Sequence, residues 1–512
     1  MGQSTSFKKW PLVIVLLSMF VVLACSRRED AVQATSPAVQ PTRSTPTQAP
    51  ETVLPTSPSP GEPTESSLPR PTTTLQVILP AEELVQPADF TYLGAFRLPD
   101  SGERPLTFEY GGNAMTFRPG APAPGGGLPG SLFISGHDRL PYGELPDGSQ
   151  IAEVTIPIPS LSRNLADLPQ AEFIQGFHNV TGGYFTQMEE IVRMGMEYLE
   201  APEGSPKIHL AWGQHFEPYP PAATHAWFSP DLSAPNLQGA WFIGDQSFYA
   251  VNDYLFAIPS GWADAYIEGR YLATGRFRDG GWSGMGPAVF AYRPWMQDGS
   301  PSPPNTRLPE TTLLLYENSI YNENIERCLD GYQHPDEWAG GAWITSGSGK
   351  AGLLFAGTKA SGDKFWYGYT NPAGPEYPCV DGDFVGQFPV CRLADGSDCP
   401  PEDLIECSGH DDFRGWWSSR FDAQFILYDP TDLARVAVGE LEPWQPQPYA
   451  MIDIDEHLYF NPPEWDQAML GLGDQRRYRI GDVAYDRENG LIYVLELFGD
   501  GAKPVVHVWQ VE

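Results

Sequence analysis

The chain has 512 residues with a formal net charge of −34, and its 52 Gly and 52 Pro together make up about a fifth of it. This Gly and Pro content disfavours a helical bundle or coiled coil and favours a turn-rich all-β fold. The acidic balance argues against a nucleic-acid partner, because phosphate binding needs clustered Lys and Arg.

The first 24 residues have the pattern of a secretory signal. Two lysines precede an apolar run from Pro11 to Ala24, which is shorter than the roughly 20 residues that a membrane-spanning helix needs. The sequence Val22-Leu23-Ala24-Cys25 resembles the lipobox of bacterial lipoproteins, although Leu23 stands where that family usually has a smaller residue. The resemblance implies an extracytoplasmic protein held at a membrane by lipid on Cys25. An ordinary signal peptide with an incidental cysteine is the alternative.

Residues 25–75 are expected to form an extended tether. Positions 31–75 hold 10 Pro, 10 Thr and 6 Ser. Such a stretch cannot bury enough apolar surface to offset its ordering entropy, and it favours polyproline II conformations. The folded domain is therefore expected within residues 76–512.

A Gly-rich start followed by an apolar strand recurs five times in this domain. The five copies begin at Tyr110, Thr181, Gly239, Gly340 and Ile480. Runs rich in β-branched and aromatic residues, bounded by Gly or Pro, predict the strands that follow. The predicted second strands are 131–135, 207–212, 253–258, 352–357 and 491–496. The third strands are 152–157, 225–230, 289–294, 425–430 and 505–511, and the fourth are 172–177, 311–316, 449–454 and 90–98.

The repeats predict an all-β fold, a β-propeller with five blades of about four strands. The last repeat ends after three strands, so the N-terminal strand 90–98 is expected to complete its sheet and close the ring. Uneven repeat spacing leaves six or seven blades as alternatives, and an irregular multi-sheet protein is another. The general pattern resembles that of secreted bacterial propeller lipoproteins.

The longest repeat interval contains a Gly-, Pro- and Asp-rich insertion at about residues 371–412. In an exported protein, clustered cysteines predict disulfides. An odd number of body cysteines leaves one over, and the sequence does not fix the pairing. Zinc is the alternative, although the spacing matches no C-x₂₋₄-C pattern. The cysteines concerned are Cys328, Cys379, Cys391, Cys399 and Cys407.

The sequence lacks the familiar catalytic and cofactor signatures. Residues 346–351 have neither the first Gly nor the final Ser or Thr of a phosphate loop. No G-x-S-x-G or H-E-x-x-H motif occurs. We expect no cofactor, and we interpret acidic turns such as Asp381-Gly382-Asp383 as solvated carboxylates, with a stabilising Ca²⁺ as the alternative.

The expected site lies at the end of the central channel where the innermost strands begin. Polar residues at or near the Gly-rich starts would meet there. The candidate catalytic carboxylates are Glu109, Asp245 and Glu337. The candidate ligand-binding residues are His178, Trp282, Trp338, Arg414, Trp416 and Arg479, and further polar residues at these starts are Asn113, Asn179, Asp336 and Asp482. Turn or capping roles for the carboxylates, and packing between blades for the tryptophans, are the alternatives.

These candidates combine carboxylates, aromatic planes and cations. Sugar hydrolysis needs paired carboxyl groups, and the set is similar at fold level to that of five-bladed glycoside hydrolases. We expect a propeller lipoprotein, anchored by lipid on Cys25, that binds a ligand such as a glycan or an envelope protein. A propeller glycoside hydrolase and a structural interaction scaffold are the alternatives.

Overall fold

The computed structural model describes the chain from residue 83 onward, in ranges separated by gaps. These ranges are 83–121, 126–137, 150–182, 193–201, 204–214, 221–278, 284–318, 327–365, 378–385, 388–391, 417–464, 470–471 and 473–512. All belong to the second of the two units into which the chain divides, Thr74–Glu512. The predicted signal, Cys25, the predicted tether and most of the insertion at 371–412 lie outside the described residues.

Five sheets follow one another along the chain, and we call them blades 1 to 5. Blade 1 contains, from the inside outward, β3 (Met115–Arg118), β4 (Leu128–Ser135), β5 (Gln150–Ile156) and β6 (Phe173–Asn179). Blade 2 contains β7 (Arg193–Leu199), β8 (Lys207–Gly213), β9 (His225–Phe228), β10 (Gln238–Ile243) and β14 (Arg307–Leu308). Blade 3 contains β11 (Leu255–Ala257), β12 (Leu272–Thr274), β13 (Val289–Tyr292) and β15 (Glu310–Leu314).

The last two blades carry the additions to the repeat. Blade 4 contains β16 (Glu337–Thr345), β17 (Lys350–Phe365), β20 (Trp417–Tyr428) and β21 (Ala450–Asp453). Its long strand β17 also pairs with β1 (Glu83–Leu84) and with β18 (Pro378–Val385), which in turn pairs with β19 (Phe388–Cys391). Blade 5 contains β22 (Ile480–Asp486), β23 (Leu491–Asp500), β24 (Lys503–Val511) and β2 (Phe90–Arg97).

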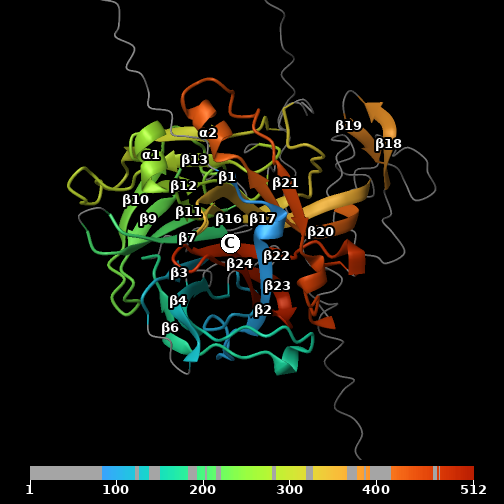
Figure 1. The fold of residues 1–512 in the computed structure, drawn as a ribbon, viewed down its shortest axis with the longest axis horizontal. Helices are drawn as coiled ribbons and strands as arrows, with labels where there is room; N and C mark the ends of the chain where they lie inside the picture. Colours follow the sequence, from blue (N-terminus) through green and yellow to red (C-terminus); the bar gives the residue numbers. More distant parts are fainter. Residues whose placement is uncertain are drawn as a thin grey trace, which may run out of the picture. The chain divides into compact units, whose positions relative to one another are not determined.

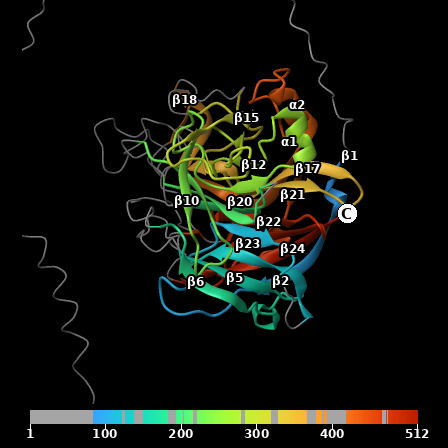
Figure 2. The same cartoon turned by 90° about the vertical axis from the view of Figure 1, so that its left-hand side faces the viewer.

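The five inner strands form a closed ring. They contact one another in the order β3, β7, β11, β16, β22 and back to β3, and they are drawn next to one another in Figure 1. The N-terminal strand β2 pairs antiparallel with β24 over Phe90–Arg97, and the two strands lie side by side in Figure 2. The structure thus confirms a β-propeller with five blades that is closed by the N-terminal strand.

Each junction between neighbouring blades has its own apolar layer. Met194 and Phe133 belong to the layer between blades 1 and 2, and Trp241 and Phe290 to the layer between blades 2 and 3. The other three layers join blades 3 and 4, blades 4 and 5, and blades 5 and 1. Because both faces of a blade are covered, inner strands such as β16 and β22 are buried along most of their length instead of alternating between buried and exposed residues.

The last hairpin shows how the sequence forms these strands. β23 has the sequence LIYVLELFGD and is buried from Leu491 to Gly499, as expected for β-branched and aromatic residues covered on both faces. The turn before it is fixed by Asp486, whose carboxylate accepts the backbone N–H groups of Glu488 and Asn489. Gly490 follows with a φ of 65°, a conformation that glycine adopts without strain.

Two short helices pack on the layer between blades 3 and 4. These are α1 (Ser260–Tyr266) and α2 (Pro430–Ala437), which place Trp262 and Leu433 in that layer. Asp429 caps α2 by accepting the N–H of Thr431 at 2.7 Å, which satisfies one of the free donors at a helix start. Within the described part of the chain, no helix is long and apolar enough to cross a membrane.

Three of the five predicted repeat starts begin a blade, and two do not. The copies at Tyr110, Gly340 and Ile480 lead into the inner strands β3, β16 and β22. The prediction that the copy at Gly239 begins a blade is wrong, because this segment forms β10 on the outer side of blade 2. The inner strand of blade 3 is β11, which we predicted as a second strand. The copy at Thr181 precedes the inner strand β7 by about ten residues.

The disulfide prediction is only partly covered by the described residues. The register of β18 and β19 pairs Cys379 with Cys391, and opposed residues of antiparallel strands lie about 4.5–5.5 Å apart at Cα, which a disulfide can span. No disulfide occurs among the described residues, Cys328 is half-buried, and Cys399 and Cys407 lie outside them. The pairing therefore stays a prediction.

Close approach of the inner strands depends on glycine. A Cβ built on Gly481 of β22 would lie 2.2 Å from the carbonyl oxygen of Gly112, just before β3. Similar contacts occur at Gly195 of β7, 2.0 Å from the carbonyl oxygen of Asp253, and at Gly340 of β16, 2.4 Å from the backbone nitrogen of Val483. A methyl group at these positions would push two blades apart.

We therefore expect Gly481→Ala to lower the free energy of unfolding by about 2 kcal/mol or more, because backbone atoms must move to admit the methyl group. Gly347→Ala is the matched control, since a Cβ there meets nothing within 4 Å, and we expect a change within about 0.5 kcal/mol. Denaturant unfolding of both variants measures the difference. Equal midpoints would show that the inner strands tolerate a wider ring.

Candidate functional site

Polar side chains from all five blades converge where the inner strands begin. Asn113 precedes β3, Arg193 begins β7, Asp253 precedes β11, Glu337 begins β16, and Asp482 lies in β22. Three arginines join them from neighbouring loops. We call this set the central polar cluster, and its members are Asn113, Arg193, Asp253, Arg276, Arg278, Glu337, Arg477 and Asp482. All are buried except Arg278, whose side chain is 10% exposed.

One part of the cluster joins blades 1, 2 and 3. The Nε of Arg193 donates to Oδ2 of Asp253 at 3.1 Å, and its Nη1 donates to Oδ1 of Asn113 at 2.9 Å. The same Asp253 oxygen also accepts the backbone N–H of Phe277 at 3.0 Å. Arg276 is held by the neighbouring amide, since its Nη1 donates to Oδ1 of Asn252 at 2.9 Å.

The other part joins blades 3, 4 and 5. Oε1 of Glu337 lies 3.2 Å from Nη2 of Arg477 and 3.7 Å from Nη1 of Arg278. Arg278 follows β12 in blade 3, whereas Arg477 precedes β22 in blade 5. One buried carboxylate therefore balances two guanidinium groups from different blades.

The ring of Phe277 connects the two parts. The guanidinium carbons of Arg193, Arg276 and Arg278 lie 4.0, 4.8 and 5.2 Å from its centroid. Arg276 also lies over the ring of Tyr249, at 3.6 Å. Aromatic faces attract cations, so the two rings hold three arginines close together without neutralising their charge.

The balance of charge in the cluster is positive. It contains four guanidinium groups and three carboxyl groups, and one of these carboxyl groups is disposed to be neutral. Burial raises the pKa of Asp482 well above its ordinary value, and the nearby Asp253 raises it further. Backbone N–H groups of Met115 and Val483 donate to Asp482 at 2.7 and 2.8 Å and act in the opposite direction. Burial, followed by the charges of Arg278 and Arg193, lowers the pKa of Arg276.

A glutamate and an arginine lie where the inner strands end. Glu197, near the end of β7, accepts the hydroxyl of Thr116 at 3.2 Å and the N–H of Ala257 at 3.1 Å. Burial raises the pKa of Glu197 to about 7, while the charge of Arg487 opposes the shift. Arg487 itself donates to the carbonyl oxygens of Trp343 and Ala257. These contacts link β7 to β3 and β11, and link the turn after β22 to β11 and β16, so they join all five blades.

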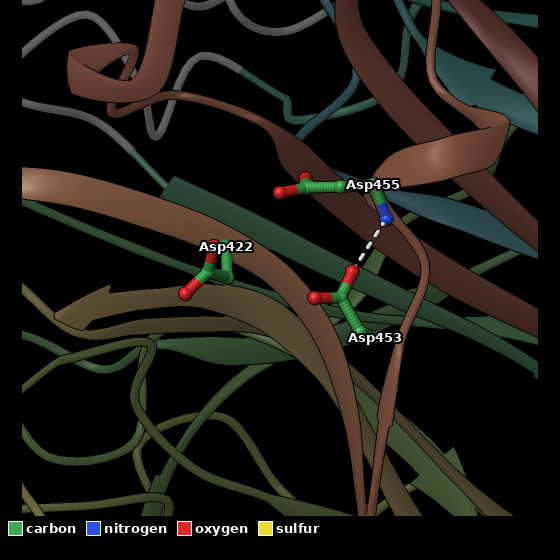
Figure 3. Close-up of side chains that lie close together, drawn as sticks. All are labelled: Asp422, Asp453 and Asp455. Carbon is green, nitrogen blue, oxygen red and sulfur yellow. Dashed lines mark hydrogen bonds between the residues drawn. The ribbon is translucent and has the colours of Figure 1, made fainter.

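Three aspartates in blade 4 form the only group of potential metal ligands found among the described residues. One carboxylate oxygen each from Asp422, Asp453 and Asp455 lies within 4.8 Å of the others, and Figure 3 shows Asp453 accepting the backbone N–H of Asp455. Carboxylate oxygens are the ligands that Ca²⁺ prefers. The expectation of a stabilising Ca²⁺ elsewhere in the chain, at the acidic turns, falls outside the described side chains.

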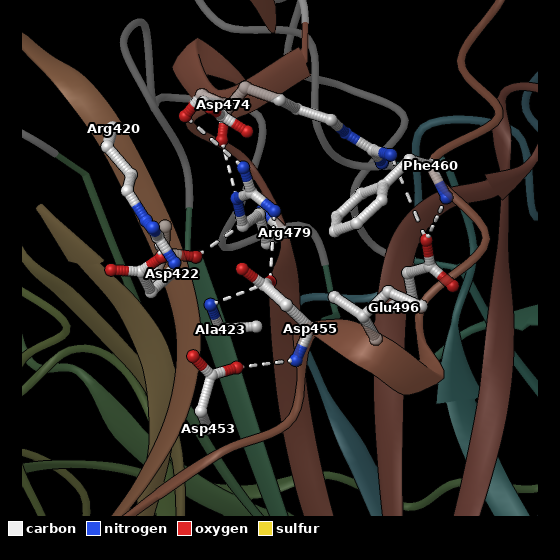
Figure 4. Close-up of polar contacts among 12 residues, drawn as sticks. Arg420, Asp422, Ala423, Asp453, Asp455, Phe460, Asp474, Arg479 and Glu496 are labelled. Atoms are coloured by element: carbon white, nitrogen blue, oxygen red, sulfur yellow. Dashed lines mark hydrogen bonds and ion pairs between the residues drawn. The ribbon is translucent and has the colours of Figure 1, made fainter.

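Arginines already supply positive charge to these aspartates. Arg479 donates to Oδ1 of Asp455 at 2.9 Å, and Arg420 donates to Asp422, as Figure 4 shows. Arg479 also donates to the backbone oxygens of Gly473 and Asp474. The group is therefore an ion-pair network that links the outer strands of blade 4 to the start of blade 5.

Of the predicted catalytic residues, the structure places only Glu337 in the central polar cluster. Asp245 follows the outer strand β10, where its side chain is fully exposed and lies 3.6 Å from Arg307. Its expected place at the channel is wrong, because that expectation took β10 for an inner strand. Glu109 precedes β3 with an exposed side chain, and its backbone oxygen hydrogen-bonds His137 at 2.8 Å.

The predicted ligand-binding residues are also dispersed. His178 is half-buried on the outer strand β6, and Trp338 lies in the apolar layer between blades 3 and 4. Arg479 belongs to the aspartate network described above. Trp282, Arg414 and Trp416 lie outside the described residues. Of the further polar residues, Asn113 and Asp482 belong to the cluster, whereas Asp336 instead pairs with Lys359 at 3.0 Å.

The sequence interpretation missed Arg193, Asp253 and the two arginines that flank Phe277. Asp253 was not selected as a site residue because residues 253–258 were interpreted as a second strand. In the structure this segment contains β11, which is the innermost strand of blade 3. The pattern Asn252-Asp253 before an apolar run was the available signal, since Asn113 stands in the same way before β3. Arg276-Phe277-Arg278 offered no comparable signal, because these residues follow a second strand.

Comparisons with known proteins identify no family. No protein-family model matches the sequence, and no curated protein matches it. The chain is similar to a solved structure, the holo form of the pyranose dehydrogenase PQQ domain from Coprinopsis cinerea, with 10% sequence identity and a TM-score of 0.29. The match covers 81% of this chain and 98% of that chain. A score this low transfers neither a ligand nor an activity.

The raised pKa of Glu197 makes stability depend on pH. The protonated carboxyl is favoured in the fold, so the free energy of unfolding falls as pH rises from the ordinary pKa of a glutamate towards about 7. We expect Glu197→Gln to flatten this decline, because its amide stays neutral. The measurement is denaturant unfolding from pH 5 to 8, with the exposed Glu172→Gln as control. Parallel curves for the wild type and Glu197→Gln would contradict the assignment.

Proposed function

We propose that this protein is an extracytoplasmic lipoprotein whose propeller binds a ligand at the central polar cluster, and that the ligand is a glycan or another component of the cell envelope. The observation that carries the proposal is the convergence of buried polar side chains from every blade on one end of the ring. A ring serving only as a scaffold could be filled there with apolar side chains, which would avoid the cost of desolvating charges.

The chemistry of the cluster suits a polar ligand. Arginines and amides can donate several hydrogen bonds in fixed directions, and carboxylates accept them from hydroxyl groups. Aromatic and charged groups at the centre of a rigid ring are also held in place before the ligand arrives, which lowers the entropic cost of binding. Arginine-rich chemistry favours an organic ligand over a metal ion, because guanidinium groups have no lone pair to offer.

The extracytoplasmic location rests on the sequence. The apolar run ending at Ala24, the lipobox-like Val22-Leu23-Ala24-Cys25 and the Pro- and Thr-rich stretch after it support secretion, lipid attachment and a spacer. A propeller displayed in this way would meet ligands of the envelope or its surroundings.

Hydrolysis of a glycoside is a second candidate function, favoured by one observation. Asp253, Glu337 and Asp482 come from three successive blades, and burial raises the pKa of Asp482. A glycosidase needs one protonated and one ionised carboxyl group, and environments that separate the pKa values of neighbouring acids provide them.

Binding to a panel of neutral and acidic envelope glycans, measured by glycan array and then by calorimetry, tests the proposed function. We expect Glu337→Gln to weaken binding by about fivefold or more, because Arg278 and Arg477 lose their shared carboxylate. Asp245→Asn is the control, since Asp245 is fully exposed outside the cluster. Absence of glycan binding would reject the glycan as the ligand, and binding weakened only by Asp245→Asn would refute the central polar cluster as the site. Release of sugars that Glu337→Gln abolishes would establish the hydrolase instead.

The lipid anchor has a separate test. We expect Cys25→Ser to move the protein from the detergent-rich phase to the aqueous phase and to abolish labelling by an alkyne fatty acid, because the thiol that carries the lipid is gone. Cys328→Ser should retain both properties. Equal labelling of the two variants would remove Cys25 as the anchor.

A further inference from the structure

Two buried arginines in the central polar cluster each have one nitrogen without a hydrogen-bond partner. These atoms are Nη2 of Arg193 and Nη2 of Arg276. Both side chains are 1% exposed, so solvent does not replace the missing partner. Buried polar atoms in native proteins almost always have one, and an unpaired buried donor costs roughly 1–3 kcal/mol, more where the group is charged.

The remaining nitrogens hold both side chains in fixed orientations. Arg193 donates through Nε to Asp253 and through Nη1 to Asn113. Arg276 donates through Nη1 to Asn252 and through Nε to the backbone oxygen of Arg278. The two arginines are thus fixed by neighbouring residues of one loop, Asn252 and Asp253. Each is left with the same terminal nitrogen unused.

The two guanidinium groups are neighbours. Both contact the ring of Phe277, with guanidinium carbons at 4.0 and 4.8 Å from its centroid. Their like charges repel, and the charge of Arg193 lowers the pKa of Arg276, so an anion near both groups would offset the cost of burying them. Asp253 is the carboxylate that pairs directly with Arg193, whereas Arg276 has no carboxylate within ion-pair distance among the described residues. Amide and carbonyl oxygens alone accept its hydrogen bonds.

Aromatic contacts do not satisfy the unused nitrogens. Phe277 and Tyr249 lie against the guanidinium groups, and the attraction of a ring face is to the charge as a whole. A guanidinium donates its hydrogen bonds in its own plane, to acceptors at its rim. Oxygens of a carboxylate or a phosphate are the acceptors that match two such donors and also offset positive charge.

We propose that Nη2 of Arg193 and Nη2 of Arg276 bind one oxyanion group of the ligand, a carboxylate or a phosphate. The inference rests on the proposed function, because it assigns ligand chemistry to the same central polar cluster. It narrows the ligand from polar envelope components in general to those that carry an anionic group. An acidic sugar and a phosphorylated component share this chemistry.

Calorimetric titration of the full wild-type chain tests the proposal without any substitution. The probes are sodium glucuronate, inorganic phosphate and, as the neutral match, glucose, all at constant ionic strength set with sodium chloride. We expect saturable binding of glucuronate or of phosphate and none of glucose. Binding of glucuronate but not of phosphate would identify a carboxylate as the bound group. Binding of phosphate but not of glucuronate would identify a phosphoryl group. Absence of saturable binding of both anions would overturn the proposal.

Two variants then locate the binding. Arg193→Lys and Arg276→Lys keep the positive charge but lose the planar fork, so each should weaken anion binding by about tenfold or more. Arg118→Lys is the matched control, because Arg118 lies outside the cluster in blade 1, where it forms an ion pair with Glu153 at 3.0 Å. Circular dichroism and the unfolding midpoint show whether each variant folds. Anion binding that both cluster variants leave unchanged would place the anion elsewhere and refute the assignment.

These experiments distinguish failure of the oxyanion site from failure of the proposed function. Binding of neutral glycans that Glu337→Gln weakens, together with no anion binding, would keep the glycan-binding function and reject the oxyanion site. Anion binding lost in Arg193→Lys, together with no glycan binding in the panel, would keep the oxyanion site and reject the glycan.

Discussion

The packing of each blade against its two neighbours is the constraint on which the rest of the structure depends. Among the described residues, the five large apolar clusters lie in layers shared by adjacent blades. A propeller of this kind is stable only when the circle is complete. β2 supplies the last strand of blade 5, so the layers on both sides of that blade depend on a strand from the opposite end of the domain. Glycines such as Gly195, Gly340 and Gly481 let the inner strands come close enough for these layers to meet.

The same geometry concentrates charge at the centre. Five inner strands that begin at one end bring their first residues together, and polar residues there must bind one another or a ligand. Arg193 and Glu337 each link different blades through side-chain contacts. Because these contacts need particular partners on different blades, they also help to specify which blade lies next to which. The structural role and the proposed ligand-binding role therefore fall on the same few residues, so substitutions there need a measure of folding beside any measure of binding.

Much of the fold was predictable from the sequence, and less of the site was. The Gly-rich starts at Tyr110, Gly340 and Ile480 identified three inner strands, and the unpaired last repeat identified β2 as the closing strand. Blades 2 and 3 were harder, because β11 has only three residues and β10 has the stronger apolar run. That exchange of inner and outer strands moved Asp245 to the centre in the prediction and left Asp253 out. Arg276 and Arg278 reach the cluster from a loop after β12, and their position depends on tertiary packing around Phe277, which no local pattern encodes.

Closure by β2 has a consequence for the order in which the protein is made. Phe90 pairs with Val511, so β2 must wait for a partner strand that is synthesised more than 400 residues later. At roughly 5–20 residues per second, translation of the intervening segment takes tens of seconds. During that interval β2 is a strand without its partner, and blades 1 to 4 can form only an open arc with an apolar face at each end. Export of the chain before folding, or a chaperone that covers those faces, would keep nascent arcs from associating with one another.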